Sequence, residues 1–379
     1  MAYYEFFCGG GMARIGLGPM WECAFANELD PKKCASYRSN FQNAAELREG
    51  DIASLISADL PGQADMAWAS FPCQDLSLAG NGTGLRGKRS GLFWTFMGLM
   101  EQLSNEGRPC RSIVLENVCG TITSHRGRDL AAICEELTRQ GYIYAPLVID
   151  AHHFVPQSRP RLFIVAYKNG VAAPPRELAG AGPHDVWHPD SFGLAYDMIS
   201  AAARDGWRWL HLPVPARRNR DLIDIVENHP SHVRWHNAFE TNKLLRMMSP
   251  INLEKVEQQR ESREIAAGTV FKRTRVEKGE RRQRAEVRFD GLAGCLRTPA
   301  GGSSRQILLL VQGNRTESRL VSPRETARLM GLPDDYVLPD RVNDALKLTG
   351  DGVAPPVVSW LARHALDHIL ADGAEEVAA

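Results

Sequence analysis

The chain has 379 residues, of which 44% are hydrophobic and 24% are charged, so it is long enough to form one large apolar core and a second, smaller one. This composition excludes a disordered or a fibrous protein. Lysine and arginine together number 45, as do aspartate and glutamate, so a uniformly basic protein that coats nucleic acid is excluded as well.

The eight cysteines show no Cys-x-x-Cys pair and no regular spacing. This pattern favours reduced thiols in a cytosol over a disulfide framework or a zinc site. The N-terminus lacks a basic segment ahead of an apolar stretch, and no apolar run approaches the roughly 20 residues that span a bilayer. We therefore expect a soluble, cytoplasmic protein.

The first 170 residues alternate short apolar runs with longer segments of helical periodicity. The short runs are followed by glycine, asparagine or proline, as buried parallel strands usually are. The expected strands are 3–7, 23–26, 64–69, 112–115 and 162–167, and the expected helices are 32–41, 92–103 and 128–139. The alternation predicts an α/β fold with a doubly wound sheet.

The pattern changes near residues 172–175. From residue 176 to 318 the chain holds 23 basic and 18 acidic residues, and the stretch 272–288 alone holds eight basic and three acidic ones. Positive charge is therefore concentrated in a second region of the chain. Helical patterns return at 323–330 and 355–370.

A glycine-rich turn, Gly9-Gly10-Gly11, follows the first expected strand. Glu28 stands at the end of the second strand and Asp51 after a third. Glycines let the backbone approach a ligand closely, and acids at these places can accept hydrogen bonds from a ribose or an adenine amino group. A nucleoside cofactor is the better interpretation; a plain tight turn is the alternative.

A cysteine, Cys73, follows the strand expected at 64–69. Active sites form at this open end of a parallel sheet, although a small buried hydrophobe is the alternative. The glycine-rich, basic segment 81–91 that follows can close over a polyanion. Glu116 ends another strand and Arg159 and Arg161 precede the next, so all four side chains should converge at one edge.

Six segments, taken together and in order, resemble the C5-cytosine DNA methyltransferase family. They are Phe7-Cys8-Gly9-Gly10-Gly11, Phe71-Pro72-Cys73-Gln74, Glu116-Asn117-Val118, Gln157-Ser158-Arg159-Pro160-Arg161, the Ser322-Pro323-Arg324-Glu325 segment with Arg328 to Asp334, and Gly350-Asp351-Gly352-Val353-Ala354-Pro355-Pro356-Val357. Met12 replaces a frequent glycine of the family. Asp351 replaces the usual asparagine, and its carboxylate is expected either to act on the cofactor or to cap the helical region 355–370.

The resemblance implies a doubly wound, Rossmann-like methyltransferase core formed by residues 1–175 and 345–379, with a target-recognition domain at 176–344. It implies a DNA (cytosine-5-)-methyltransferase, EC 2.1.1.37, which flips a cytosine out of duplex DNA. A cysteine then bonds to C6 while C5 receives a methyl group from S-adenosylmethionine. S-adenosylhomocysteine is the implied product, and no metal is expected.

The resemblance also implies roles for individual residues. The expected catalytic residues are Cys73, Glu116, Arg159 and Arg161. The expected cofactor-binding residues are Phe7, Gly9, Gly11, Glu28, Leu29, Asp51, Ile52, Pro72, Leu92, Asp351, Gly352 and Val353. The expected DNA-binding residues, which contact phosphates or guanine edges, are Arg86, Lys88, Arg89, Arg217, Arg218, Arg220, Lys272, Arg273 and Arg275.

The implied partner is double-stranded DNA, bound by a monomer in the cytoplasm at the nucleoid, with a cognate restriction endonuclease as a further candidate partner and no membrane. Three alternatives remain open at this point. They are methylation of a transfer RNA, a binding-only protein that has kept the fold, and a nicotinamide-dependent oxidoreductase, which would share the glycine turn and Glu28.

Overall fold

The computed structural model describes residues 1–72, 91–277, 279–298 and 305–371. The chain forms two compact units. Unit 1 comprises Met1–Asp150, Pro160–Val214 and Val357–Ala379, and unit 2 comprises Ala151–Arg159 and Pro215–Pro356. The boundaries expected from the sequence, at residues 175 and 345, differ from these, because residues 176–214 pack within unit 1 and residues 345–356 within unit 2.

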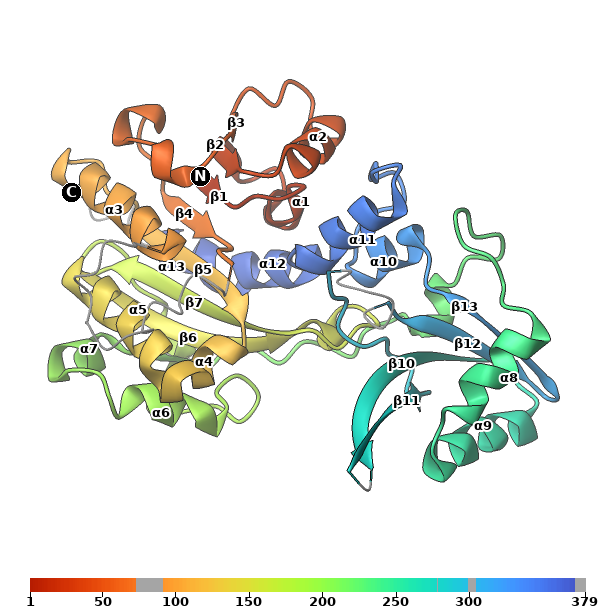
Figure 1. Ribbon diagram of the computed structural model, residues 1–379. Helices are drawn as coiled ribbons and strands as arrows, with labels where there is room; N and C mark the ends of the chain where they lie inside the picture. Colours follow the sequence, from red (N-terminus) through yellow and green to blue (C-terminus); the bar gives the residue numbers. More distant parts are fainter. Residues whose placement is uncertain (73–90, 278, 299–304, 372–379) are drawn as a thin grey trace. The chain divides into compact units, whose positions relative to one another are not determined.

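Unit 1 contains a seven-stranded sheet with the strand order β3-β2-β1-β4-β5-β7-β6 (Figure 1). The strands are β1 Ala2–Phe6, β2 Glu22–Glu28, β3 Leu47–Glu49, β4 Met66–Ala69, β5 Ser112–Val118, β6 Tyr142–Asp150 and β7 Pro160–Lys168. Strands β1 to β5 are parallel, whereas β7 is antiparallel to both β5 and β6. The α/β fold class is confirmed.

The expectation that strand 162–167 is parallel is wrong. The segment between β6 and β7, residues 151–159, is shorter than the dozen or more residues that a crossover between parallel strands requires. The two strands therefore pair as neighbours of opposite direction.

Helices of unit 1 cover its sheet. Apolar side chains of α3 and α5 share one core with apolar side chains of β1, β4, β5 and β7. Trp207 belongs to this core and packs against the ring of Tyr144 on β6, which explains why its segment belongs to unit 1. The helices are α1 Met12–Leu17, α2 Pro31–Asn40, α3 Leu92–Asn105, α4 Gly120–Thr123, α5 Arg128–Arg139, α6 Gly193–Tyr196, α7 Ala201–Gly206 and α13 Asp367–Ala371, with α12 Pro355–Leu361 beginning at the boundary between the units. Two short strands, β8 Ala179–Gly180 and β9 Trp209–Leu210, pair with each other.

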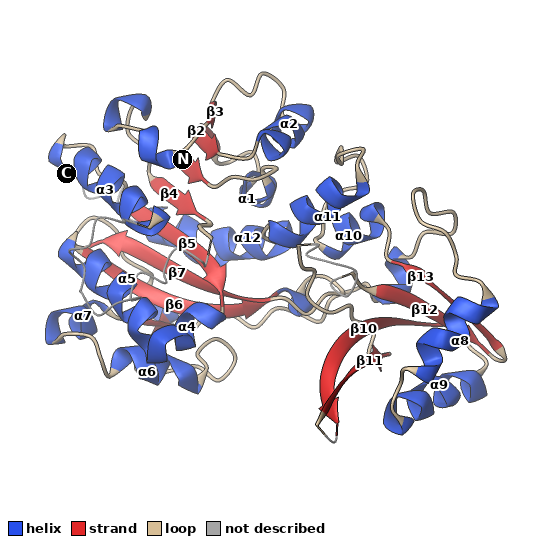
Figure 2. Cartoon of the chain, in the orientation of Figure 1, coloured by secondary structure: helices blue, strands red, loops and turns tan. Residues whose placement is uncertain are grey.

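Unit 2 contains a four-stranded antiparallel sheet with the order β11-β10-β12-β13 (Figure 2). Its strands are β10 Ala266–Glu277, β11 Glu280–Arg288, β12 Ile307–Gln312 and β13 Arg315–Leu320, and its helices are α8 Ala238–Arg246, α9 Pro250–Ser262, α10 Pro323–Leu329 and α11 Val342–Asp351. Apolar residues of α8 and α9, such as Leu244 and Val256, pack against Val270 and Leu309 of the sheet. Within the described residues of both units, no helix is long and apolar enough to cross a membrane.

A buried ion pair joins β13 to α10 in unit 2. The guanidinium of Arg319 donates to both carboxylate oxygens of Glu325, at 2.7 and 2.6 Å, and lies 4.7 Å from the ring centroid of Trp235. Glu325 also accepts a hydrogen bond from the backbone N–H of Ser322 and so closes the capping box at the start of α10. The segment from Ser322 to Glu325 therefore stabilises the interior of unit 2.

We predict that Glu325→Gln destabilises unit 2 by about 3 kcal/mol or more, because it leaves the buried Arg319 charge uncompensated. Urea denaturation would measure the loss. The control is Glu257→Gln, which breaks an exposed pair with Arg260 one helical turn away and should cost about 0.5 kcal/mol or less. Equal losses in the two variants would contradict a stabilising role for the buried pair.

Candidate active site

The carboxyl ends of β1, β2, β4 and β5 lie at one edge of the unit 1 sheet, because these strands are parallel. The chain runs from β1 outward through β2 and β3 and then returns to β4 on the other side of β1. Ligands of open α/β sheets bind at such a reversal, outside the carboxyl ends of the strands. The expected catalytic and cofactor residues of unit 1 that the structure describes lie at or near this edge.

Glu28 at the end of β2 holds the glycine turn that follows β1. Its Oε2 accepts the backbone N–H of Gly9 at 2.9 Å, and its Oε1 accepts those of Leu29 and Asp30 at 2.9 and 2.8 Å. A carboxylate has about four acceptor positions, so one remains for a ligand. The expected contact between Glu28 and a ribose stays a prediction, and these bonds add a structural role.

The turn itself requires glycine. Gly11 has a φ of +76°, and a Cβ there would lie 2.2 Å from a ring carbon of Phe41. Gly9 has a φ of +57° but open space where its Cβ would be. Phe7, just before, also adopts a positive φ of 59°, which costs energy in a residue other than glycine. The backbone conformation of this turn therefore lowers local stability, as is common in turns that bind ligands.

The segment after β3 carries the other expected cofactor residues. Asn27 donates to the carbonyls of Arg48 and Gly50, both at 3.0 Å, and so fixes this segment beside the end of β2. Asp51 is exposed and caps the following short turn through the N–H of Ala53. The expected residues Ile52, Leu92 and Pro72 are buried, half-buried and exposed, respectively.

A second polar group lies at the ends of β4 and β5. Asn117 donates from Nδ2 to the carbonyl of Phe71 at 3.0 Å and accepts the N–H of Val118 at its Oδ1. This bond fixes the chain two residues before Cys73. Cys73 itself lies outside the described residues, as do the expected DNA-binding residues Arg86, Lys88 and Arg89.

The structure brings Glu116 and Arg161 together. Glu116 is buried near the end of β5, and Nε of Arg161 lies 3.3 Å from its Oε1. The register explains the pair: Arg161 at the start of β7 lies opposite Val118, so it shares a sheet face with Glu116 two positions along β5. The contact between Glu116 and Arg161 requires β7 to be antiparallel to β5.

Arg159 has different surroundings from Arg161. It is buried in unit 2, where its guanidinium donates to the carbonyls of Leu296, Gly350 and Gly352 at 3.2, 2.8 and 2.6 Å. Two of these carbonyls lie at the end of α11, where a positive charge is stabilising. These contacts give Arg159 a bracing role in unit 2.

Asp351, the last residue of α11, accepts a hydrogen bond at its carboxylate from the hydroxyl of Thr298. This contact with Thr298 was not expected from the sequence, which predicted that Asp351 either acts on the cofactor or caps the helical region 355–370. Of the neighbouring cofactor candidates in unit 2, Gly352 is half-buried and Val353 is buried.

A sequence model of the C-5 cytosine-specific DNA methylase family matches residues 1–366. The chain belongs to this family. The methylase is 26% identical to the type II methyltransferase M.BanI of Aneurinibacillus aneurinilyticus, with 94% of this chain and 93% of that protein covered. It is 25% identical to M.HpaII of Haemophilus parainfluenzae, with 97% and 89% covered. The protein is thus a DNA (cytosine-5-)-methyltransferase, and the oxidoreductase alternative is wrong.

Solved structures agree with this fold. The methylase resembles the Entamoeba histolytica methyltransferase EhMeth with a TM-score of 0.62 at 12% identity, covering 98% of both chains. It resembles the S. pombe Dnmt2 methyltransferase with a TM-score of 0.56 at 17% identity, also covering 98% of both chains. At such low identity these likenesses show the fold alone.

The expected DNA-binding residues of the methylase that the structure describes lie in unit 2. Arg217 and Arg220 are exposed, whereas Arg218 is held by Asp221 at 2.7 Å and is only 10% exposed. The remaining three, Lys272, Arg273 and Arg275, lie on β10.

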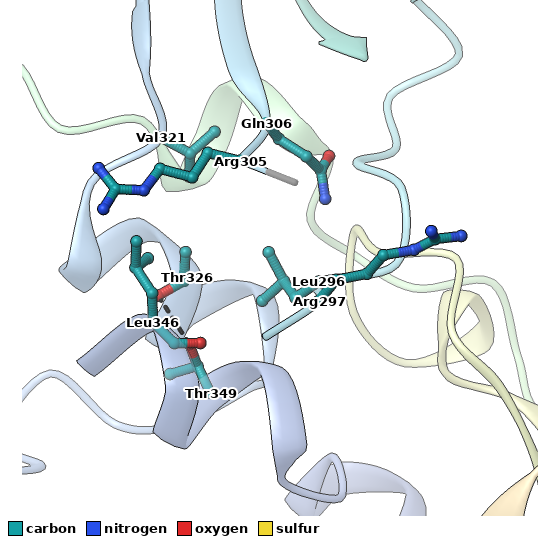
Figure 3. A pocket seen from close by; sticks show the side chains of 8 residues that line it. All are labelled: Leu296, Arg297, Arg305, Gln306, Val321, Thr326, Leu346 and Thr349. Atoms are coloured by element: carbon teal, nitrogen blue, oxygen red, sulfur yellow. Dashed lines mark hydrogen bonds between the residues drawn. The ribbon is translucent and has the colours of Figure 1, made fainter. Parts of the chain in front are cut away.

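A pocket of unit 2 contains none of the expected site residues (Figure 3). Hydroxyls of Thr349 and Thr326 are hydrogen-bonded at 3.1 Å on one side of it, and Arg297 and Arg305 extend from its rim. It is lined by Leu296, Arg297, Arg305, Gln306, Val321, Thr326, Leu346 and Thr349. Within the described parts of the methylase, no group of three or more histidine, cysteine or acidic side chains is placed to hold a metal.

A buried acid behind the glycine turn escaped the sequence analysis. Glu5 is the penultimate residue of β1, and its Oε2 has no hydrogen-bond partner among the described residues. Burial raises the pKa of Glu5 to about 8; Arg14 opposes the shift, and Glu28 and Glu46 add to it. The available signal was an acid within an otherwise apolar strand.

We predict that Glu5→Gln stabilises the methylase increasingly as the pH rises from about 4.5 to about 8. Over this interval the folded wild type retains a proton that the unfolded chain releases, so wild-type stability falls with pH, whereas glutamine does not titrate. The difference should reach the order of 4 kcal/mol at pH 8 in urea denaturation. Glu49→Gln, at an exposed pair with Arg38, is the control, and a pH dependence of Glu5→Gln parallel to that of wild type would contradict the prediction.

Proposed function

We propose that the methylase flips a cytosine out of duplex DNA and methylates its C5 through a covalent bond between Cys73 and C6. The observation that carries this proposal is the Glu116–Arg161 pair, 3.3 Å apart at the sheet edge where β4 leads toward Cys73. A cytosine stacked in a duplex is out of reach of a side chain, so the base has to leave the helix.

The residues at the reversal point of the sheet fit a nucleoside cofactor, S-adenosylmethionine. Gly9 has open space beside its Cα, Glu28 retains acceptor capacity, and the apolar side chain of Leu29 is 62% exposed beside it. Phe7, Gly11, Asp51, Ile52, Pro72 and Leu92 complete the proposed site in unit 1. When bound, the cofactor supplies an electrophilic methyl group on a sulfonium.

The reaction begins at C6 of the cytosine, because C5 of the aromatic ring is a poor nucleophile. The Cys73 thiolate adds to C6 and forms an S–C6 bond, while the displaced electron pair moves to N3 and is neutralised by a proton shared with Glu116. The electron pair then returns from N3 to C5, which takes the methyl group as the methyl–sulfur bond breaks with its electrons left on sulfur. Loss of the C5 proton to solvent expels the Cys73 thiolate, and the N3 proton returns to Glu116.

Arg161 has two tasks in this scheme. Its Nε orients the Glu116 carboxylate, and its guanidinium, which also donates to the carbonyl of Pro160, can donate to O2 of the base. Arg159 acts as a positioning residue, through the backbone segments it braces in unit 2. We further propose a monomer acting on double-stranded DNA in the cytoplasm, and the type II names of the relatives support a cognate restriction endonuclease as a partner.

We predict that Cys73→Ser abolishes methyl transfer and leaves DNA and S-adenosylmethionine binding largely intact, because a serine hydroxyl is far less ionised than a thiol at neutral pH. A duplex containing 5-fluorocytosine cannot release the C5 substituent and should trap the wild type covalently. The control is Cys119→Ser, close to the same edge of the sheet, which should still be trapped. Appreciable turnover by Cys73→Ser would refute the assigned nucleophile.

We predict that Glu116→Gln lowers kcat by roughly 100-fold or more, because the amide cannot share a proton with N3. Single-turnover methyl transfer would measure the step. Glu101→Gln, at an exposed pair with Arg139, should leave the rate unchanged. A near-native rate for Glu116→Gln would mean that another group neutralises the ring.

A further inference from the structure

Strands β10 and β11 continue as a two-stranded ribbon beyond the rest of the unit 2 sheet (Figure 2). β10 pairs with β12 only from Ala266 to Val270, but with β11 from Thr269 to Glu277. We call residues 271–277 and 280–286 the ribbon. The stretch 272–286 holds seven basic and three acidic residues, so its charge is strongly positive.

The pairing register sorts the side chains of the ribbon onto two faces. Val270, Ala285 and Val287 lie on the face that packs on the core of unit 2. On the other face Arg273 lies directly opposite Arg284, and Arg275 directly opposite Arg282. We call these four residues the arginine face. Like charges opposite one another destabilise a sheet, so this arrangement costs stability in the free protein.

Glu286 forms ion pairs with two of the four residues of the arginine face, Arg273 and Arg275. Glu286 lies 3.5 Å from Nε of Arg273 through its Oε2 and accepts a hydrogen bond from Nε of Arg275 at 2.8 Å through its Oε1. Arg273 is further confined by Phe271, whose ring centroid lies 6.0 Å from the guanidinium carbon. The two guanidinium groups are thereby oriented together, while their side chains remain 55% and 51% exposed.

A second acid on the ribbon provides a natural comparison. Glu280 forms an ion pair with Arg282 on its own strand, and both side chains are well exposed, at 69% and 59%. Glu286 is only 27% exposed and bridges to two residues on the opposite strand. Glu280 therefore adds the same charge as Glu286 without fixing a pair of arginines.

The dimensions and charge of the ribbon match one partner, duplex DNA. Two strands lie about 4.8 Å apart, and the major groove of B-form DNA, about 12 Å wide, admits such a ribbon. The major groove of A-form RNA is too narrow for side chains to read. An oriented arginine can donate two hydrogen bonds to O6 and N7 of guanine, whereas a freely moving arginine takes any phosphate.

We propose that Arg273 and Arg275, the two residues of the arginine face that Glu286 holds, read base edges in the major groove of the substrate duplex, and that Glu286 determines sequence specificity by orienting them. This inference rests on the proposed function only in taking duplex DNA as the substrate. Glu286 neutralises one of the two charges and limits the side-chain freedom of both arginines. Its removal frees them for phosphates, so affinity for unrelated DNA rises while discrimination falls.

The test compares Glu286→Gln with Glu280→Gln, because each removes one negative charge from the ribbon. Sequencing of DNA methylated by the wild type first locates the methylated site. Dissociation constants are then measured for a duplex with that site and for a scrambled duplex, across a range of salt concentrations. Thermal unfolding of both variants checks that the fold is retained.

Glu286→Gln should lower the ratio of site to scrambled affinity by about 10-fold, as expected for losing one bidentate base contact. It should also steepen the salt dependence on the scrambled duplex by up to about one unit, since a freed arginine gains a phosphate contact. Its methylation should spread to cytosines outside the mapped site. Glu280→Gln should change the affinity for both duplexes alike and leave their ratio unchanged.

Equal changes of the ratio in both variants, or no change in either, would overturn the role of Glu286. An RNA duplex of the same sequence that competes as well as the DNA would overturn the groove assignment. Failure of the proposed function is separate, because it would appear in the wild type as the absence of C5 methylation in the first step.

Discussion

The candidate active site depends on the direction of one strand. β7 runs antiparallel to β5, so its first residues lie beside the last residues of β5. This reversal places Arg161 next to Glu116, although 45 residues separate them in the sequence. A parallel β7 would begin at the opposite edge of the sheet, and the carboxylate would lack its arginine.

Polar side chains at the strand ends give this edge a fixed shape. Glu28, Asn27 and Asn117 each bond backbone groups that the sheet leaves unpaired. Such groups are costly when buried without a partner, so the side chains that satisfy them also fix the loops in place. The same edge includes buried Glu5, whose unpaired oxygen costs stability. The loops at this edge are therefore held in fixed positions, while the buried Glu5 lowers the stability of the fold.

The sequence predicted most of the sheet and the chemistry of its edge, because both depend on local signals. The expected helix at 128–139 matches α5, and the expected strand at 112–115 begins where β5 begins but ends three residues early. The direction of β7 was not predictable from apolar runs, since period does not encode strand direction. The extent of unit 1 depends on Trp207 packing on Tyr144, a contact between distant segments that composition does not reveal.

Side-chain roles were predictable by residue type and much less by environment. Arg159, Arg161 and Arg218 look equivalent in the sequence, yet they bond backbone carbonyls, a buried carboxylate and a neighbouring aspartate, respectively. The partners of Arg159 lie more than 130 residues away. The role of Glu286 was not predictable for a similar reason. Its contacts with two arginines of the opposite strand depend on the pairing register of β10 and β11.

The Arg-Pro-Arg segment of the motif crosses the boundary between the two units. Arg159 is anchored in unit 2, Arg161 is paired with Glu116 in unit 1, and Pro160 alone separates them. Proline restricts the backbone torsion φ, so this joint is stiffer than an ordinary peptide link. Two peptide bonds therefore separate the residue anchored in unit 2 from the residue that pairs with Glu116. The chain thus changes from one unit to the other within this short motif, at a peptide link with less rotational freedom than most.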